Sequence, residues 1–197
     1  MVVPRAGRVQ HGGVADDETG PSAPGGHTPD GGVLVGSSGA RRHAVVYEDP
    51  QCPACKQFEE TSGDLVRREI AAGALAVEYR MMTFIGPGSL PANNALALAA
   101  EHGSFDALRQ RLFAVQPAEG TQLTVETILA AAREGGVTDA DVEQGLRDGR
   151  YEEWVLAVDE AFSEQNQVGT PAMVLDGVPV DTAVLFDPDA LGVLLRG

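Results

Sequence analysis

The chain has 197 residues, of which 43% are hydrophobic, and this length suits one globular domain with a sizeable core rather than two large domains. Its 14 Lys and Arg against 29 Asp and Glu give a formal net charge of −15, which argues against nucleic acid as a partner. The longest apolar runs, such as residues 95–100, are far shorter than the roughly 18 to 20 residues of a membrane-spanning helix. Only two cysteines, Cys52 and Cys55, are present.

Residues 1–29 are rich in glycine and proline and contain no aromatic residue. We expect a flexible tail or linker, because so little apolar surface cannot offset the entropy of ordering the segment. Arg5 and Arg8 are not followed by an apolar stretch, so the segment lacks the pattern of a signal peptide. An export signal or membrane anchor would therefore have to lie outside this sequence. Residues 30–197 form the expected domain.

The first part of that domain has a strand, helix, strand pattern. Residues 33–35 and 44–47 are short apolar runs bounded by turn residues, and both are expected to be strands of one sheet. The spacing of the next apolar side chains predicts an amphipathic helix that begins at Pro53 and stops at Gly73. Residues 75–82 read as another strand, and the connection is long enough to make it parallel to the previous one.

A helical insertion is expected from about residue 88 to residue 165, where apolar residues recur at helical spacing between short breaks. The expected helices are residues 90–101, 105–114, 125–133, 140–146 and 151–163.

The end of the chain returns to sheet character. Residues 172–175 and 178–180 are apolar runs separated by Asp-Gly, a strong signal for a tight hairpin. Pro179 places the second strand at a sheet edge, because proline has no N–H for a second neighbour. A last helix is expected over residues 188–195, with proline in its first turn.

The cysteine pair, Cys52-Pro53-Ala54-Cys55, lies at the junction between a predicted strand and a predicted helix. Cys52 is therefore expected where the first free N–H groups of the helix and its positive dipole end stabilise a thiolate. Pro53 suits the first turn, and Cys55 points back toward Cys52 one turn later as a resolving thiol. Lys56, the only lysine, either adds positive charge nearby or is simply solvated.

Three interpretations of the pair remain open from the residues alone. A structural disulfide would close a very short loop and would restrain little chain entropy. A zinc or iron–sulfur site would need further ligands, and the four histidines do not supply a paired spacing beside the cysteines. A redox-active dithiol needs only these two cysteines at a helix start beside a strand-helix-strand pattern, and it is the favoured interpretation.

Residues 47–58 resemble the active-site segment of DsbA-like thiol-disulfide oxidoreductases, which have the thioredoxin fold. Residues 169–177 are similar to the loop, strand and hairpin around the cis-proline of that family, and residues 92–100 and 105–116 resemble its helical insertion. The resemblance implies an α/β fold, with a mixed sheet flanked by helices and an inserted α-helical domain. It also implies that Pro171 is cis beside the cysteines, and that the backbone of Thr170 pairs with an extended substrate.

Two features depart from the family pattern. Val46 stands six residues before Cys52, where many thioredoxin-like proteins carry a buried acid that handles the proton of the resolving thiol. Glu48 or a water molecule would then have to serve. The residues between the cysteines, Pro53 and Ala54, include no histidine that would favour the Cys52 thiolate, so the strength of the oxidant is open.

The resemblance implies a redox-active disulfide between Cys52 and Cys55 with no cofactor and no metal. The expected protein is a bacterial, monomeric, extracytoplasmic oxidant of exported proteins, tethered or secreted through a segment absent here, although a cytoplasmic location is not excluded. Its partners would be cysteine-containing proteins and a redox partner, such as a membrane quinone-linked oxidase, that reoxidises the dithiol. The alternatives are a thioredoxin-like reductase or isomerase and a copper-binding chaperone. Phe84, Trp154 and Phe162 are candidates for a substrate groove or for core.

Overall fold

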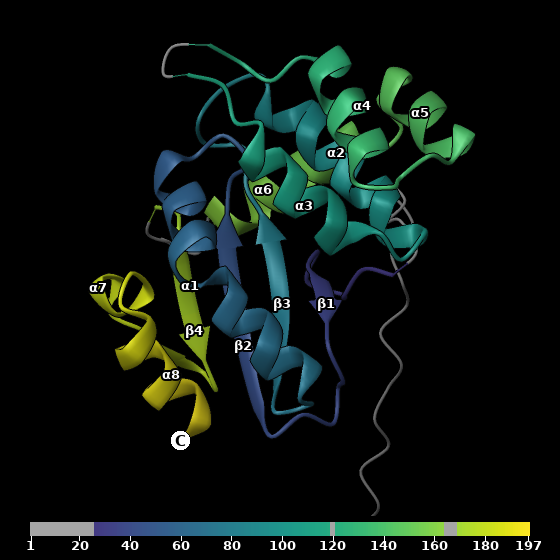
Figure 1. The fold of residues 1–197 in the computed structure, drawn as a ribbon. Coiled ribbons are helices and arrows are strands. Elements are labelled where there is room, and N and C mark those ends of the chain that lie inside the picture. Colours follow the sequence, from purple (N-terminus) through teal and green to yellow (C-terminus); the bar gives the residue numbers. More distant parts are fainter. Residues whose placement is uncertain (1–25, 119–120, 164–168) are drawn as a thin grey trace, which may run out of the picture.

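The computed structural model describes residues 26–118, 121–163 and 169–197, and side chains are not described for residues 161–163. Its centre is a mixed five-stranded sheet in the order β1-β3-β2-β4-β5 (Figure 1). Strands β2 and β3 are parallel, and the other neighbouring pairs are antiparallel. The strands are β1 (Val33–Val35), β2 (Arg42–Glu48), β3 (Leu75–Met81), β4 (Ala172–Leu175) and β5 (Val178–Pro179).

Helix α1 (Pro53–Ala71) connects the parallel strands β2 and β3, as the sequence pattern predicts. It begins with proline at its first turn, where the missing N–H costs no hydrogen bond. Its buried stripe includes Phe58, Leu65 and Val66, which pack against the sheet. Gly73 has φ of 69°, a left-handed conformation that favours glycine and lets the chain turn into β3.

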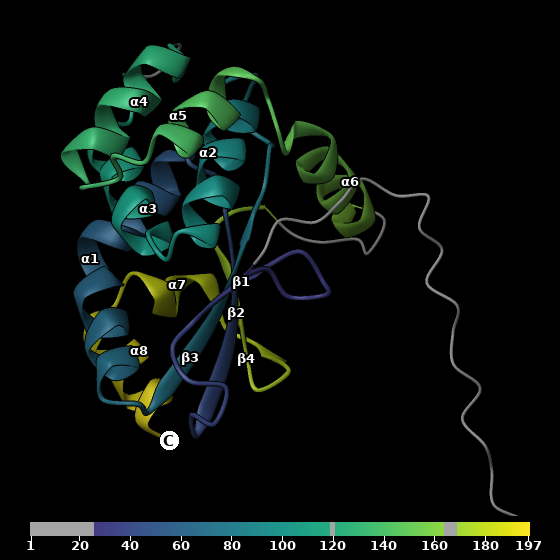
Figure 2. The same ribbon diagram turned by 90° about the vertical axis from the view of Figure 1, so that its right-hand side faces the viewer.

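The predicted helical insertion follows β3 and covers the ends of β2 and β3 toward which both strands run (Figure 1). Helix α6 lies on the opposite side of the sheet from α1 (Figure 2). Thr124 and Asp139 cap α4 and α5 by accepting hydrogen bonds from free N–H groups of the first turn. The five helices are α2 (Ser89–Glu101), α3 (Phe105–Ala114), α4 (Val125–Glu134), α5 (Ala140–Arg147) and α6 (Glu152–Ser163).

The C-terminal segment forms the predicted hairpin and then two helices. Asp176 and Gly177 have φ of 48° and 81°, the positive values that a tight hairpin turn between β4 and β5 requires. Strand β5 lies at the sheet edge, as Pro179 indicated. Helix α7 (Thr182–Leu185) was not predicted, whereas α8 (Pro188–Arg196) was, and both lie on the same side of the sheet as α1 (Figure 2).

The expected tail, residues 1–29, lies mostly outside the described residues. Its last part belongs to the domain instead: His27 forms a β-bridge with Val33, and the Thr28 hydroxyl donates to Glu78 Oε1 at 3.1 Å. These bonds order the chain a few residues before residue 30. Within the described part of the chain, no helix is long and apolar enough to span a membrane.

Candidate functional site

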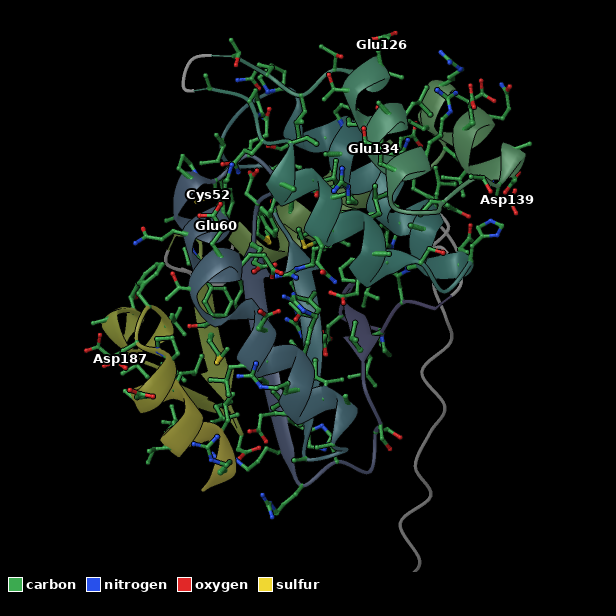
Figure 3. The ribbon with its side chains drawn as sticks, viewed as in Figure 1. Cys52, Glu60, Glu126, Glu134, Asp139 and Asp187 are labelled. Carbon is green, nitrogen blue, oxygen red and sulfur yellow. The ribbon has the colours of Figure 1, made fainter. Side chains whose placement is uncertain are left out.

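Cys52 occupies the N-terminal end of α1, directly after the loop that leaves β2 (Figure 3). Cys52 is the N-cap residue of α1, with an extended backbone (φ of −74° and ψ of 118°), and no side-chain hydrogen bond caps the helix. The Cys52 N–H donates to the carbonyl of Asp49 at 3.0 Å, which fixes the loop between strand and helix. The Cys52 sulfur is therefore placed at the free N–H groups of the first turn.

The surroundings of Cys52 stabilise its thiolate. A hydrogen bond from the Cys55 thiol is the largest effect, and with hydrogen bonds from Thr170 and from the N–H groups of Cys55 and Ala54 it outweighs burial. Together they lower the pKa of Cys52 from 9.0 to about 6. Cys52 is consequently ionised at neutral pH, as a reactive cysteine must be.

Cys55 has the opposite character. Its side chain is 0% exposed, and burial, the hydrogen bond to Cys52 and the negative charge of Glu48 all raise its pKa. Both cysteines are reduced in the structure. The two buried sulfurs therefore differ in their pKa, which is lowered at Cys52 and raised at Cys55.

The Thr170–Pro171 loop lies against this pair. The peptide bond between Thr170 and Pro171 is cis, as the resemblance implied. The Cys52 sulfur lies 3.3 Å from the carbonyl oxygen of Thr170. Strand β4 begins at the next residue, Ala172, and pairs with Tyr47 of β2, so the sheet itself brings this distant loop to the cysteines.

A family model described as thioredoxin matches residues 28–189. The chain belongs to the thioredoxin family. No curated protein is a significant match to the sequence.

Solved structures of the same fold include oxidoreductases. Reduced DsbG from Mycobacterium tuberculosis, a disulfide bond oxidoreductase, shares 26% identity with a TM-score of 0.74 over 86% of this chain and 88% of that chain. Reduced DsbA from the same organism shares 26% identity with a TM-score of 0.67 over 76% and 84%. MdbA from Actinomyces oris, a thiol-disulfide oxidoreductase, has a TM-score of 0.78 at 22% identity over 89% and 92%, which shows the shared fold. The predicted resemblance to DsbA-like proteins and the predicted fold class are thus confirmed.

The last residue of β2, Glu48, places an acidic side chain near the cysteines. Val46, at the position where many thioredoxin-like proteins carry a buried acid, is 1% exposed in the apolar core. Glu48, two residues later, is 0% exposed and forms a two-point ion pair with Arg109 of the helical insertion. Burial raises the pKa of Glu48, and the guanidinium of Arg109 opposes this by stabilising the carboxylate.

A second polar network connects the loop between β2 and α1, here called the cysteine loop, to the helical insertion. The Asp49 carboxylate accepts from the N–H groups of Gln51 and Ile85 and from the Ser89 hydroxyl, at 2.7 to 3.0 Å. Gln116 donates to the carbonyls of both Pro50 and Cys52 at 3.0 Å. These residues hold the backbone on which Cys52 sits.

Sequence reasoning did not assign Arg109, Asp49 or Gln116 to the site. All three residues lie within the segments that resemble the family, but only Asp49 is close to the cysteines in sequence. An arginine on a predicted amphipathic helix is ordinarily solvated, and only the fold shows that the Arg109 side chain is 2% exposed.

The remaining candidates lie at different distances from the chemistry. Lys56 forms only a loose pair with Glu60, at 4.0 Å. Phe84 is 42% exposed, and its neighbour Ile85 is hydrogen-bonded to Asp49, so this apolar loop adjoins the cysteine loop. Trp154 instead packs edge-on against His27, with ring centroids 4.5 Å apart. The side chain of Phe162 lies outside the described residues.

Proposed function

We propose that the protein is a thiol-disulfide oxidoreductase that exchanges disulfides with proteins through Cys52 and Cys55. The observation that carries this proposal is the asymmetry of the pair: a thiolate-forming Cys52 against the Thr170 carbonyl, and a fully buried Cys55 behind it. Thiol-disulfide exchange needs one low-pKa sulfur and a second sulfur that closes the disulfide.

In the oxidising direction, a substrate thiolate attacks the Cys52 sulfur of the Cys52–Cys55 disulfide. The bond between the two cysteine sulfurs breaks, Cys55 leaves with the electron pair and takes up a proton, and a mixed disulfide joins substrate to Cys52. A second substrate thiolate then attacks the substrate sulfur and expels Cys52. The substrate leaves as a disulfide and the enzyme as a dithiol.

The lowered pKa of Cys52 favours oxidase activity, because a stabilised thiolate favours the reduced enzyme and makes its disulfide more oxidising. DsbG and DsbA of Mycobacterium tuberculosis, each 26% identical, support the same class of chemistry. A stable oxidised pair also fits an extracytoplasmic setting, where the substrates would be exported proteins with cysteines. A separate redox partner, such as a membrane quinone-linked oxidase, would then reoxidise the dithiol.

The test compares Cys52→Ser and Cys55→Ser with the native protein in the oxidation of a reduced peptide that carries two cysteines. We expect Cys52→Ser to abolish exchange and Cys55→Ser to accumulate mixed disulfides through Cys52. Alkylation of reduced Cys52 should reach half its maximal rate near pH 6, the pKa of its thiol. Full exchange activity in Cys52→Ser would overturn the proposal.

The midpoint potential of the pair sets the direction of the reaction. A value near about −120 mV would support the oxidant, whereas a value near about −270 mV would indicate a thioredoxin-like reductant. Stoichiometric copper in the purified reduced protein would instead support a metal-binding chaperone.

A further inference from the structure

Arg109 of α3 is a fully buried cation at the junction between the helical insertion and the redox pair. Its Nε and Nη2 donate to the two carboxylate oxygens of Glu48 at 2.6 and 2.8 Å, and its Nη1 donates to Glu59 at 2.9 Å. The guanidinium also lies 4.4 Å from the ring centroid of Tyr79. Such complete enclosure and two-point pairing hold both charges in fixed positions.

The groups that Arg109 joins flank the cysteines on both sides. Glu48 is the last residue of β2, four positions before Cys52. Glu59 lies four positions after Cys55 on α1, and residues at this spacing share one helix face. Phe113 packs against both cysteines, and its ring centroid is 5.2 Å from the Arg109 guanidinium. Arg109 thus connects the strand before the pair, the helix that carries it and the ring against it.

The cluster around Arg109 has more negative than positive groups. The carboxylates of Glu48, Glu59 and Asp106 face Arg109, and Arg67 pairs with Glu59 at the outer end. An unpaired buried carboxylate would take up a proton, because burial disfavours its charged form. At Glu48, burial raises the pKa of the carboxyl, and the paired guanidinium of Arg109 opposes that rise.

We propose that Arg109 is a positioning residue that keeps Glu48 ionised beside the redox pair, and that this charge holds Cys55 as a thiol after a substrate has bonded to Cys52. The inference rests on the proposed function, since it concerns the mixed disulfide that this function forms. The charge of Glu48 also contributes to the raised pKa of Cys55 in the reduced protein.

The consequence concerns the fate of the mixed disulfide. When substrate attacks Cys52, Cys55 leaves with the electron pair and is protonated by solvent. Cys55 can reverse this step only by losing that proton and attacking the Cys52 sulfur, which expels the substrate thiolate still reduced. Because ionised Glu48 disfavours the Cys55 thiolate, the mixed disulfide persists until a second substrate thiol completes the oxidation.

The test follows the reaction of the reduced protein with an aromatic disulfide reagent, which releases one coloured thiolate when it bonds to Cys52 and a second when Cys55 closes the protein disulfide. We expect Glu48→Gln to accelerate the second release at neutral pH about tenfold, which is the change in thiolate fraction for a lowering of the Cys55 pKa by about one. The first release should change by less than about twofold, because Glu48 is not among the main groups that stabilise Cys52.

Three variants control this measurement. Glu60→Gln removes a negative charge from an exposed site on α1 (Figure 3) and should leave both releases unchanged. Arg109→Met should accelerate the second release, because Glu48 then takes up a proton, and Arg109→Lys should restore a slow second release by keeping the positive charge. If Glu48→Gln fails to fold, the neutral pair Glu48→Gln with Arg109→Met replaces it, with the same expected acceleration.

Two results would overturn the inference. A second release in Glu48→Gln as slow as in Glu60→Gln would show that the Glu48 charge does not act on Cys55. A slower second release would show that Glu48 accepts the Cys55 proton, a general-base role with the opposite sign. Failure of the proposed function would give a different result. The Cys52→Ser protein would then still release the first coloured thiolate from the disulfide reagent.

Discussion

Helix α1, which carries both cysteines, is packed in different ways against its two neighbours. Toward α8 and the sheet its buried packing is mainly apolar, with Leu65 of α1 and Leu191 and Leu195 of α8 in one cluster, and one ion pair joins Glu69 to Arg196 at the surface. Toward the helical insertion it meets charge, because Glu59 reaches Arg109 of α3. Cys52 lies at the end of α1 that faces the insertion (Figure 3).

We expect the apolar contacts to contribute mainly to the stability of the fold, and the polar contacts to determine the orientation of the residues around the cysteines. Apolar contacts are non-directional, so the α8 side contributes stability in proportion to its buried area and tolerates small shifts. Hydrogen bonds lose strength when distance or angle changes, so the insertion side fixes where Glu48 and the cysteine loop lie. Substitutions on the two sides should therefore affect different measurements.

The largest effect is expected for Arg109→Met on the insertion side. We expect the free energy of unfolding to fall by about 3 to 5 kcal/mol, because Glu48 would remain buried without a partner. Chemical denaturation of the reduced protein measures the change. Arg111→Met, on the same helix but in an ion pair of the surface with Glu134, is the matched control and should cost less than about 1 kcal/mol.

The loss in Arg109→Met should depend on pH. Burial already raises the pKa of Glu48 in the folded protein, and removing Arg109 raises it further. A carboxyl whose folded pKa lies above its unfolded value stabilises the fold at low pH and loses that contribution as pH rises. The destabilisation should therefore be smaller near pH 5 than near about pH 8. An equal loss at both values would contradict an ionised Glu48.

Next in size is Leu191→Ala on the α8 side. Leu191 is 0% exposed, and its truncation should cost about 2 to 5 kcal/mol through lost burial and an unfilled cavity. The pH profile of Cys52 alkylation should nevertheless stay unchanged, since no polar contact of the site is altered. A shifted profile would show that the apolar side also orients the cysteines.

The elements on the α8 side of α1 were largely predictable from the sequence, whereas the ion pairs on the insertion side were not. The apolar spacing predicted α1 and α8, and Asp-Gly predicted the hairpin, because local patterns and turn residues determine these elements. Helix α7 was missed because it spans only Thr182–Leu185, too short for a periodic signal. Arg109 was missed because its pairing with Glu48 joins residues 61 positions apart, and only the folded topology brings them together.

A smaller effect is expected for Gln116→Ala at the cysteine loop. The Gln116 amide donates to two backbone carbonyls, and its loss leaves both without this donor. We expect a cost of about 1 to 2 kcal/mol and a slower, more heterogeneous alkylation of Cys52. Gln144→Ala removes an amide that donates to the Asp148 carboxylate on an exposed face, so it should leave both measurements unchanged.

The smallest effect is expected for Lys56→Met, although this residue directly follows Cys55. Its ammonium lies 4.0 Å from an exposed carboxylate of Glu60, and such pairs contribute less than about 1 kcal/mol. The groups that lower the pKa of Cys52 are the Cys55 thiol, Thr170 and backbone N–H groups, so the alkylation profile should not move. A profile shifted to higher pH would show that Lys56 supports the thiolate. We expect the alkylation profile to stay unchanged in Lys56→Met and the second thiolate release from the disulfide reagent to become faster in Arg109→Met. Together these results would show that the buried cation acts on the cysteines, whereas the exposed cation next to them in sequence does not.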